Sequence, residues 1–520
     1  MLLGNVHLNS NQKHYNIEKK SILFLSIIFV VALSIRFYFV PYGIPVNFDA
    51  FAGFFLYALD ITILGTLPNY TLSQSGWSEF LSLFFMSYHS DNLIDYMNLQ
   101  RTISVIISGF TVIPIYFISK NFFNNNYSLI GAIIFAFEPR IIINSTLGLS
   151  EPLYVLAISL GILFFLNTNK KIIYMSFGFL GWATIIRPEG QFWFLAVSIS
   201  YFLRFRKNRK DLIMFLVCLS IFLLVLSPIV IHRIQCCEND AIVGRILVEL
   251  TNYEKNSIDS NIQSEVIPYG PNFANGIWLL GWALIPIFVI FVPIGIISIF
   301  RQWKFPENLL IIIPSILAMT IIYSLSIAQD TRYALPIYPV LCVIALFGIK
   351  LIVNNFKNKK LLVIIIISGI ITGSIIFLDF NKNDYTNDKD AYEISRLLIS
   401  DVKGVNKSSK VVEFFKVAEI DMKWPKIEYT GRLSDSFEIK RISEKGFDSL
   451  EEFLIFGKNE GLTHLIIDES ENLPMYMKEI FYEEENYEYL IKEFDSTELN
   501  FQYKAKMYKI DYNVFNILQR

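Results

Sequence analysis

Apolar runs of about 15–25 residues follow one another from residue 21 to residue 379. A helical run of about 20 apolar residues is long enough to cross the hydrocarbon core of a bilayer. Residues 380–520 contain no such run and mix polar and apolar positions as soluble proteins do. The pattern predicts a mainly α protein, with a polytopic transmembrane helix bundle over residues 1–379 and a soluble domain over residues 380–520.

The apolar pattern predicts about eleven spans. They are expected near residues 21–40, 101–119, 127–143, 152–167, 172–186, 191–203, 212–232, 277–300, 308–327, 333–352 and 361–379. The first run follows Lys19 and Lys20 but is too long for a removable signal peptide and has no small-residue cleavage site. We therefore expect it to be a retained span.

The composition agrees with this division. Of the 520 residues, 53% are hydrophobic and only 18% are charged, and the mean hydropathy is +0.44. This composition is far more apolar than that of a typical soluble globular protein. Residues 380–520 hold 20 Lys and Arg against 28 Asp and Glu. An acidic soluble domain without a basic patch excludes nucleic acid as a partner.

Basic residues are concentrated in alternate loops. With a cytoplasmic N-terminus, the inner loops are 1–20, 120–126, 168–171, 204–211, 301–307 and 350–360, and they hold about 17 Lys and Arg against 3 acids. The segment 41–100, on the opposite side, contains no Lys or Arg. Cytoplasmic loops are enriched in positive residues, so we expect a multi-pass cell-membrane protein whose N-terminus is cytoplasmic. The odd number of spans then places the C-terminal domain on the extracytoplasmic side.

The soluble segment is predicted to be an α/β domain. Helices are expected at 391–405, 447–461 and 474–496, and strands at Val411–Phe415, Thr463–Asp468 and Lys504–Asp511.

The first outer loop, residues 41–100, contains two amphipathic stretches, Phe48–Leu67 and Trp77–Tyr88. Both are too short or too interrupted for spans, so we expect helices that lie along the membrane surface. Asp49 stands among the phenylalanines of the first stretch. A carboxylate shielded from water by apolar neighbours binds a proton more readily, which makes Asp49 a candidate general base.

Ionisable residues that the positive-inside pattern does not explain all fall on the outer face, at or just beyond the ends of spans. They are Asp49, Glu151, Arg187, Glu189, Asp330 and Arg332. A charge at membrane depth costs about 2.5–3.5 kcal/mol on insertion scales and commonly belongs to a functional site. Any one of these residues could instead be a loop charge in contact with water or headgroups. Their convergence on one face favours a common site.

Several blocks of the sequence together resemble the GT-C superfamily of polytopic glycosyltransferases. The blocks are VNFDAFAGFFLYAL with Asp49, RTISVIISGFTVIPIYFISK followed by SLIGAIIFAFEPRIIINSTLGLSEPLYVL, GFLGWATIIRPEG with Arg187 and Glu189, and DTRYALPIYPVLCVIALFG with Arg332, Tyr333 and Pro336. Members of this superfamily take sugars from polyprenyl-phosphate carriers at the extracytoplasmic membrane face. The resemblance covers most of residues 21–379 and includes the architecture of many spans followed by an outer soluble domain.

The resemblance implies a hexosyltransferase that moves a mannose-like sugar from a polyprenyl- or dolichyl-phosphate in the lipid bilayer to a glycan, lipid or protein acceptor at the extracytoplasmic face. Asp49 would be the base for the acceptor hydroxyl. Arg187 and Arg332 would bind the donor phosphate through charge-assisted hydrogen bonds, because a guanidinium fork matches two phosphate oxygens. A single displacement with one base would invert the anomeric centre.

Glu151, Glu189 and Asp330 are the supporting acidic candidates. Glu151 opens the fourth predicted span, where a helix N-terminus favours an acid without any catalytic role. With Asp49 it could also hold a Mg²⁺ or Mn²⁺ ion against the donor phosphate, as the resemblance would allow. Zinc has no support, because the sequence has no His/Cys cluster at ligand spacing.

The sequence departs from two branches of the superfamily. The protein mannosyltransferase and aminoarabinose transferase branches usually carry an Asp-Glu pair in the first loop, whereas Asp49 precedes Ala50. The oligosaccharyltransferase branch carries Trp-Trp-Asp in its soluble domain, whereas Lys423-Trp424-Pro425 is the nearest sequence here. Transfer of a whole glycan to asparagine is therefore not the leading hypothesis.

Two other classes of function remain open. A polytopic transporter or a lipid or polysaccharide flippase also has many spans, but its site lies near the bilayer midplane between internal repeats. The sequence indicates neither repeated halves nor charges in the middle of spans. A non-catalytic surface assembly or sensor protein would explain neither the long first loop nor the charges gathered on one face.

Overall fold

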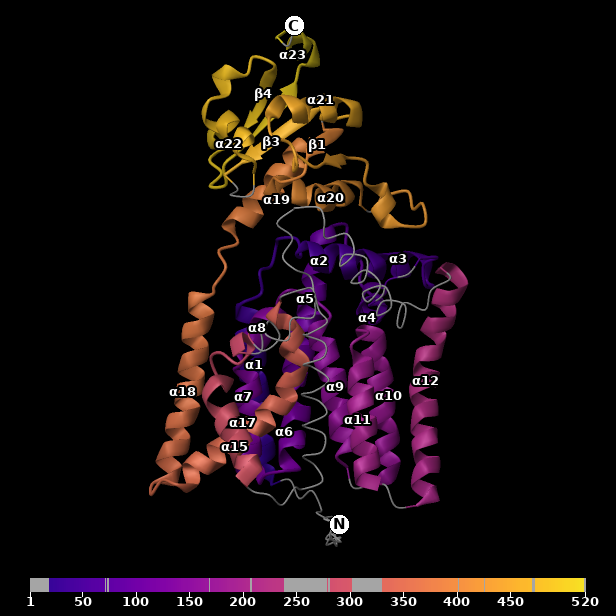
Figure 1. Ribbon diagram of the computed structural model, residues 1–520, viewed down its shortest axis with the longest axis vertical. Coiled ribbons are helices and arrows are strands. Elements are labelled where there is room, and N and C mark those ends of the chain that lie inside the picture. The colour runs from indigo at the N-terminus through magenta and orange to yellow at the C-terminus, as the bar shows by residue number, and fades with distance from the viewer. Residues whose placement is uncertain are drawn as a thin grey trace, which may run out of the picture.

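The long helices of the chain run side by side as a bundle, and a small domain with a β-sheet sits at one end of it (Figure 1). The computed structural model describes residues 18–70, 72, 74–167, 169–205, 208–237, 278, 281–301, 330–400, 402–424, 426–469 and 473–518. The bundle comprises α1 (Lys19–Tyr38), α5 (Leu93–Phe110), α6 (Val112–Lys120), α7 (Asn125–Ala136), α8 (Pro139–Ser145), α9 (Glu151–Phe165), α10 (Lys170–Ile186), α11 (Gly190–Phe205), α12 (Arg209–Cys237), α15 (Phe288–Arg301), α17 (Tyr338–Asn354) and α18 (Lys359–Phe380). A 3₁₀ turn, η3 (Thr331–Ile337), leads into α17.

Within these described ranges, five helices are long and apolar enough to cross a membrane: Lys19–Tyr38, Leu93–Lys120, Arg209–Cys236, Thr331–Asn354 and Lys359–Phe380. The count becomes six if α7 and α8, bent by 52° at their junction, form one span. The shorter helices α9, α10 and α11 occupy the other spans expected between residues 152 and 203. The multi-pass membrane architecture is therefore confirmed, while the expected span 308–327 lies outside the described residues.

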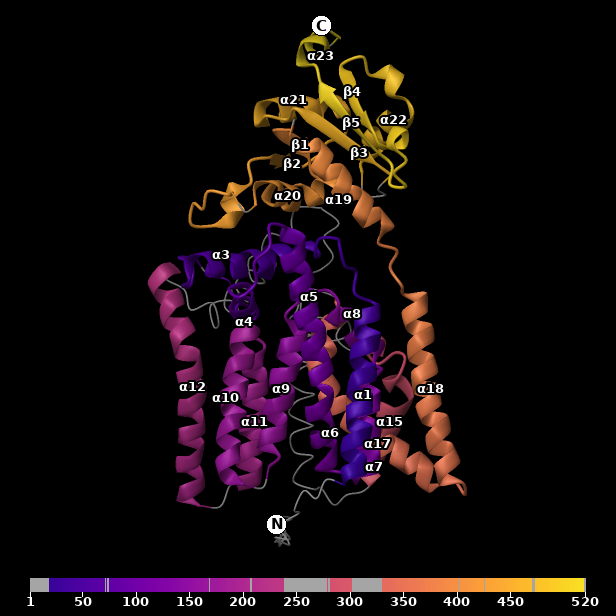
Figure 2. The same ribbon diagram turned by 180° about the vertical axis from the view of Figure 1, so that it is seen from behind.

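Burial separates central helices from peripheral ones. The most apolar window of Thr331–Asn354 is 83% buried, whereas that of α18 is 17% buried. α18 and α12 stand at opposite sides of the bundle in both side views (Figures 1 and 2). Exposed apolar surface of this extent is unfavourable in water and favourable in lipid. The outer helices thus present a surface that suits a bilayer.

The first outer loop forms short helices that lie across the end of the bundle, beneath the sheet domain (Figure 1). They are α2 (Phe48–Ala50), the π-helix η1 (Phe51–Phe55), α3 (Leu56–Leu64) and α4 (Ser75–Phe85). Gly65, with φ of +67°, ends α3 in the left-handed conformation that glycine adopts without strain. Both amphipathic stretches are helical, as predicted.

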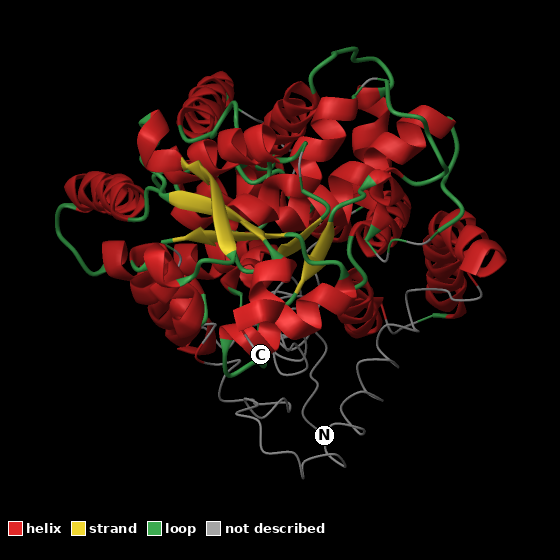
Figure 3. Ribbon diagram, turned by 90° about the horizontal axis from the view of Figure 1, so that it is seen from above, coloured by secondary structure: helices red, strands yellow, loops and turns green. Residues whose placement is uncertain are grey.

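The C-terminal domain contains a five-stranded sheet of order β2-β1-β3-β5-β4, which lies over the middle of the bundle when seen from above (Figure 3). β1 pairs in parallel with β2 and β3, whereas β5 runs antiparallel to β3 and β4. The strands are β1 (Gly404–Asn406), β2 (Lys440–Ile442), β3 (His464–Asp468), β4 (Leu490–Asp495) and β5 (Ala505–Ile510). The helices are α19 (Thr386–Leu398), α20 (Lys410–Lys423), α21 (Leu450–Glu460), α22 (Met475–Tyr482) and α23 (Tyr512–Leu518), with short 3₁₀ turns η4 (Leu433–Ser436), η5 (Glu484–Asn486) and η6 (Ser496–Leu499). The predicted α/β class is confirmed.

Three predicted elements of this domain differ from the structure. The helix predicted at 391–405 ends at Leu398, and Gly404–Asn406 forms β1. The segment Val411–Phe415 is the first part of α20, not a strand. Its buried positions are 411, 412 and 415, which share one face of a helix. The helix predicted at 474–496 ends at Tyr482, and Leu490–Asp495 forms β4. Short apolar runs fit either type of element until the partners are known.

The domain is fixed to the first outer loop and the start of α5 by three hydrogen bonds, two at the end of α20 and one at η4. Asp421 Oδ1 accepts a bond from the Leu93 N–H at 3.1 Å. The Trp424 indole N–H donates to the Ser90 carbonyl oxygen at 3.2 Å. The Leu433 N–H donates to Asp60 Oδ1 at 3.0 Å. Trp424 therefore serves here as a docking residue between the domain and the loop.

Candidate active site

Asp49 is held at the end of the bundle by the loop that precedes it. It lies in α2, whose N-terminus is capped by Asn47 Oδ1, the acceptor for the Ala50 N–H at 2.8 Å. The buried guanidinium of Arg101 donates to the Ile44 and Pro45 carbonyl oxygens, both at 2.7 Å. These bonds tie the loop to α5, so the backbone that carries Asp49 is fixed.

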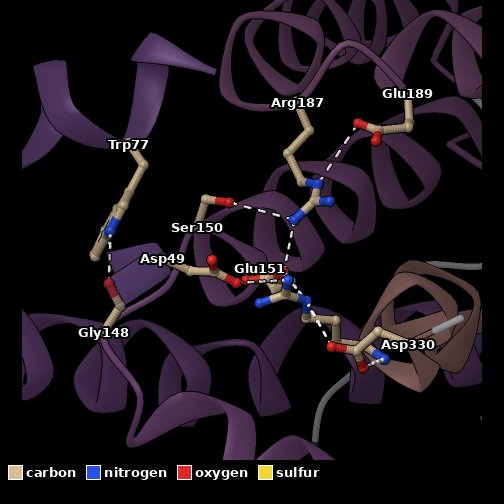
Figure 4. A network of polar contacts seen from close by, with 9 residues as sticks. Asp49, Trp77, Gly148, Ser150, Glu151, Arg187, Glu189 and Asp330 are labelled. Atoms are coloured by element: carbon tan, nitrogen blue, oxygen red, sulfur yellow. Dashed lines mark hydrogen bonds and ion pairs between the residues drawn. The ribbon is translucent and has the colours of Figure 1, made fainter. Parts of the chain in front are cut away.

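Glu151 is the first residue of α9, as the sequence predicted. The turn before it requires Gly148, whose φ is +75°, and a Cβ there would lie 3.1 Å from the Gln100 side chain. The Gly148 carbonyl oxygen accepts hydrogen bonds from Gln100 Nε2 at 2.6 Å and from the Trp77 indole at 3.0 Å. These contacts fix the start of α9 and thereby the backbone position of Glu151, and Figure 4 shows the contact from Trp77.

Arg187 and Glu189 lie in the tight turn between α10 and α11. α10 ends at Ile186, and Arg187 has an extended backbone. The Gly190 N–H donates to the Arg187 carbonyl oxygen at 2.9 Å. A Cβ at Gly190 would lie 2.6 Å from the backbone of Thr184, so only glycine fits this turn. The block RPEG is therefore a turn that presents one guanidinium and one carboxylate together.

Asp330 and Arg332 lie at the start of η3. Asp330 caps this turn, because its Oδ1 accepts the Arg332 N–H at 2.9 Å. Arg140 of α8 donates to the neighbouring Thr331 Oγ1 at 3.2 Å and to the carbonyl oxygens of Trp282 and Ile285. Arg140 thus joins this turn to α8, a role that the sequence did not indicate.

The six predicted site residues meet in one network of ion pairs (Figure 4). Glu151 Oε1 lies 2.6 Å from Arg187 Nη1 and 3.9 Å from Arg332 Nε, so this carboxylate connects the two arginines. The remaining pairs are Arg332 Nη2 with Asp49 Oδ2 at 2.8 Å, Arg332 Nε with Asp330 Oδ2 at 2.9 Å, and Arg187 Nε with Glu189 Oε2 at 3.5 Å. Residues from four separate segments of the chain thus form one cluster.

Two further residues belong to this cluster. Ser150 Oγ lies 3.5 Å from Arg187 Nη1. The Tyr333 ring lies 5.0 Å from the Arg187 guanidinium carbon and 5.7 Å from that of Arg332, within the range of cation–π attraction. The position of Tyr333 directly after Arg332 was visible in the sequence, but its contact with Arg187 depends on the fold.

The cluster borders a cavity of about 350 Å³, which we call the arginine cavity. It is lined by Phe48, Asp49, Ala52, Gly53, Phe54, Leu72, Gln74, Leu149, Glu151, Arg187, Arg332 and Tyr333. The volume lies within the usual range of ligand pockets, about 300–1,000 Å³. The lining combines aromatic and small apolar residues with a few charged groups, which is typical of a binding site.

Asp49 is less shielded than its sequence environment suggested. Its side chain is 59% exposed, because Phe51 and Phe55 turn into the protein core while Asp49 faces the cavity. The expectation of a carboxylate enclosed by phenylalanines is therefore wrong. Side chains at different positions of a helix point in different directions, so the Asp49 side chain faces away from those of Phe51 and Phe55.

Two buried ionisable residues lie toward the outer ends of expected spans. Arg36 of α1 is fully buried and donates to Ser108 Oγ at 2.9 Å and to the Ala136 carbonyl oxygen at 3.0 Å. Glu138 is fully buried at the bend between α7 and α8. Arg36 connects three helices, and Glu138 caps α8, so both have structural explanations.

The fold and the cluster define a polytopic membrane protein with a candidate transferase site where the bundle meets its soluble domain. Residues 97–232 match the family model described as dolichyl-phosphate-mannose-protein mannosyltransferase. No curated protein matches the chain in sequence.

Solved structures of two kinds share the fold. The oligosaccharyltransferase of Archaeoglobus fulgidus, in a complex with zinc and sulfate, matches with a TM-score of 0.57 at 11% identity, over 86% of this chain and 68% of that chain. The same archaeal enzyme, AglB, with an inhibitory peptide and a dolichol-phosphate gives 0.55 at 12% identity, over 86% and 69%. ArnT from Cupriavidus metallidurans, bound to undecaprenyl phosphate, gives 0.52 at 8% identity, over 94% and 97%.

The family model matches one segment of the chain, and the solved structures share the fold over most of its length. Both findings agree with the resemblance drawn from the sequence.

Proposed function

We propose that this protein transfers a mannose-like hexose from a polyprenyl-phosphate carrier to an acceptor hydroxyl at the extracytoplasmic membrane face. The observation that carries the proposal is the arginine cavity, where Asp49, Arg187 and Arg332 meet at the end of the bundle. A family model named for dolichyl-phosphate mannose supports the donor class, as do neighbours bound to dolichol-phosphate and undecaprenyl phosphate. The acceptor would be a glycan, a lipid or a protein.

In the proposed reaction, Asp49 accepts the proton of the acceptor hydroxyl while the hydroxyl oxygen bonds to the anomeric carbon. The bond from that carbon to the phosphate oxygen breaks, and the phosphate leaves with the electron pair. Arg332 and Arg187 stabilise the charge on the leaving phosphate through their N–H donors. One displacement of this kind inverts the anomeric centre.

The charge of the cluster bears on how a phosphate would bind. Two guanidinium groups face four carboxylates, those of Asp49, Glu151, Glu189 and Asp330, so the formal charge is two negative. A donor phosphate must therefore displace carboxylates from the arginines, or a cation must enter with it. In either mode of binding, we expect the ion pairs of the cluster to rearrange when the donor binds.

A divalent cation such as Mg²⁺ or Mn²⁺ is part of the proposal. Glu151 Oε2 is buried and makes no hydrogen bond within the described residues, and both Glu151 and Asp49 lie within 4 Å of Arg332. These two carboxylates would hold the ion, which would neutralise phosphate charge. The described ranges contain no group of three or more His, Cys, Asp or Glu side chains suited to a metal, so donor phosphate or water would supply the other ligands.

The position of the cluster favours a transferase over a transporter. A transporter site lies near the bilayer midplane, whereas this cluster lies at the ends of α9 and α10, next to the first-loop helices. In the proposed topology, residues 1–379 carry the site and residues 380–520 form the outer domain above it.

The test is donor turnover by the purified full-length protein in lipid nanodiscs. Polyprenyl- and dolichyl-phosphate hexoses are supplied one at a time, with Mg²⁺, Mn²⁺ or EDTA. We expect release of the free polyprenyl phosphate with at least one donor, and a loss of this release in EDTA if the cation is required. Failure to turn over any polyprenyl-phosphate hexose would contradict the proposal.

A further inference from the structure

Arg36 of α1 is a positive charge buried inside the bundle, and no carboxylate pairs with it within the described residues. Its Nη1 donates to the carbonyl oxygens of Ala32 at 2.9 Å and Ala136 at 3.0 Å, whereas its Nη2 has no hydrogen-bond partner there. A buried charge without a counter-charge is costly, and at membrane depth such a charge commonly belongs to a functional site. The helix contacts of Arg36 therefore leave its charge unexplained.

Ser108 of α5 connects Arg36 to a small cavity next to the candidate active site. Arg36 Nε donates to Ser108 Oγ at 2.9 Å. Ser108, Asn144 and Glu151 all line a cavity of about 10 Å³, which we call the Ser108 cavity. Glu151 also lines the arginine cavity. One carboxylate thus borders both the Ser108 cavity and the cavity that holds the two site arginines.

The Ser108 cavity has the size and the polar walls of a site for one water molecule. A volume of about 10–15 Å³ suffices for one water, which needs two to four polar partners. Because Arg36 donates to Ser108 Oγ, the Ser108 hydroxyl keeps its own proton to donate. Glu151 Oε2 is buried and has no hydrogen-bond partner in the part of the chain that the structure describes. A water between them can accept a hydrogen bond from Ser108 and donate one to Glu151.

We propose that Arg36 is a positioning residue for Glu151 and acts on it through Ser108 and one buried water. This inference rests on the proposed function, in which the donor phosphate competes with Glu151 for Arg187 and Arg332. Every hydrogen bond of the chain runs from the cation toward the carboxylate, so each bond strengthens the next. A carboxylate has about four acceptor sites, so the water does not prevent Glu151 from also holding a cation.

The chain gives Glu151 a second partner when a phosphate takes its first. In the structure, Glu151 Oε1 lies 2.6 Å from Arg187 Nη1 and 3.9 Å from Arg332 Nε. A phosphate bound to both guanidinium groups weakens these ion pairs, and the buried charge of Glu151 then needs other donors. Arg36 supplies them from inside the bundle. Without the chain, Glu151 should compete more strongly for the arginines, and phosphate should bind more weakly.

The test measures the dissociation constant of undecaprenyl phosphate by native mass spectrometry of the full-length protein in EDTA. Ser108→Ala removes the hydroxyl, and Arg36→Gln removes the charge. For both variants we expect a roughly tenfold or greater rise in the dissociation constant, the effect of losing one hydrogen bond that involves a charged group. Ser104→Ala is the matched control and should cause no change. Ser104 is also buried, lies one turn earlier in α5, makes no hydrogen bond within the described ranges and lines neither cavity.

Glu151→Gln distinguishes a positioning role from structural support. The amide is neutral, so it leaves no negative charge for Arg36 to stabilise. We expect Ser108→Ala to weaken binding in the wild-type background and to have little further effect in the Glu151→Gln background. A purely structural role of Ser108 would weaken binding by the same factor in both backgrounds.

The outcomes separate this inference from the proposed function. A wild-type protein that binds no undecaprenyl phosphate and cleaves no polyprenyl-phosphate hexose would overturn the proposed function itself. Wild-type binding that is unchanged in both Ser108→Ala and Arg36→Gln would overturn only the role of Arg36, and so would equal effects of Ser108→Ala in the two backgrounds. The thermal unfolding midpoint is measured for each variant, and if Arg36→Gln does not fold, the Ser108→Ala result decides.

Discussion

Each arginine of the candidate site is shared among several carboxylates. Arg332 lies within 4 Å of Asp49, Asp330 and Glu151, and Arg187 lies within 4 Å of Glu151 and Glu189. A planar guanidinium can satisfy several acceptors at fixed angles, whereas an ammonium acts as a point charge. The network therefore depends on arginine at both positions.

We expect Arg332→Lys to raise the donor KM and lower transfer by about tenfold or more, because one ammonium cannot replace the directed bonds to Asp49 and Asp330. Lys445→Arg, an exposed change in the soluble domain, serves as the control and should have no effect. Arg332 and Arg187 share Glu151, so the effects of changing both should not add. Unchanged donor affinity and rate in Arg332→Ala would remove this residue from the site.

Gly148→Ala tests the turn that positions Glu151. The φ of +75° disfavours alanine by about 1–2 kcal/mol, and the new methyl group would press on Gln100. We expect a lower thermal unfolding midpoint and reduced transfer. Gly369→Ala in α18 is the matched control, because that glycine has ordinary helical geometry and open space around it. Equal behaviour of the two variants would contradict the positional role of Gly148.

At the scale of elements, the sequence predicts those features that local patterns determine. Long apolar runs predicted the helices α1, α5–α6, α12, α17 and α18, because only a helix satisfies its backbone hydrogen bonds within lipid. Val411–Phe415 was mistaken for a strand, because five apolar-rich residues fit both periodicities. Its helical state is set by packing inside the domain.

In the candidate site too, the sequence predicts the features that local patterns determine and misses those that depend on the fold. The one-sided charges could be grouped from the sequence, because topology alone places span ends on a common face. The exposure of Asp49, the cation–π contacts of Tyr333 and the anchoring by Arg140 depend on segments far apart in the chain. No local pattern contains that information.

Asp60 is the element-scale connection between the first loop and the soluble domain. It is fully buried in α3 and accepts hydrogen bonds from Tyr70 and from the Leu433 N–H. Burial raises the pKa of Asp60, although the hydrogen bonds from Tyr70, Leu433 and Tyr429 act in the opposite direction. The docking of the domain should therefore depend on pH.

The direction in which stability changes with pH follows from the difference in proton binding between the native and unfolded states. With a raised native pKa, the native state binds the Asp60 proton more tightly than the unfolded state, whose carboxyl has a pKa of about 3.9. The contribution of Asp60 is fully present below that value and is lost as pH rises through the native pKa. In Asp60→Asn this dependence should disappear, so the unfolding midpoint of wild type relative to the variant should fall as pH rises from about 4. Asp91→Asn, an exposed change in the same loop, is the control, and a pH-independent difference between wild type and Asp60→Asn would refute the prediction.

At the scale of the whole molecule, the distribution of basic residues predicts which side the soluble domain occupies. The predicted inner loops hold about 17 Lys and Arg, so the positive-inside rule places these loops in the cytoplasm and the soluble domain outside. We expect protease added to sealed right-side-out vesicles to cleave residues 380–520 and to leave the basic loop at 204–211 intact. Protection of the domain until detergent is added would reverse the topology and move the site to the cytoplasmic face.

Asp49→Asn, measured as sugar transfer by the purified, reconstituted protein, tests the central claim most directly. The amide keeps the size of the side chain but cannot accept the proton, so transfer should fall by about 10²–10⁴. Insertion in the membrane and binding of polyprenyl phosphate should persist, because Arg187 and Arg332 remain. Titration with Mg²⁺ or Mn²⁺ distinguishes a base from a metal ligand, since only loss of a ligand makes donor binding weaker in a cation-dependent manner. Wild-type transfer rates in a well-inserted Asp49→Asn protein would contradict the account and leave transport as the stronger hypothesis.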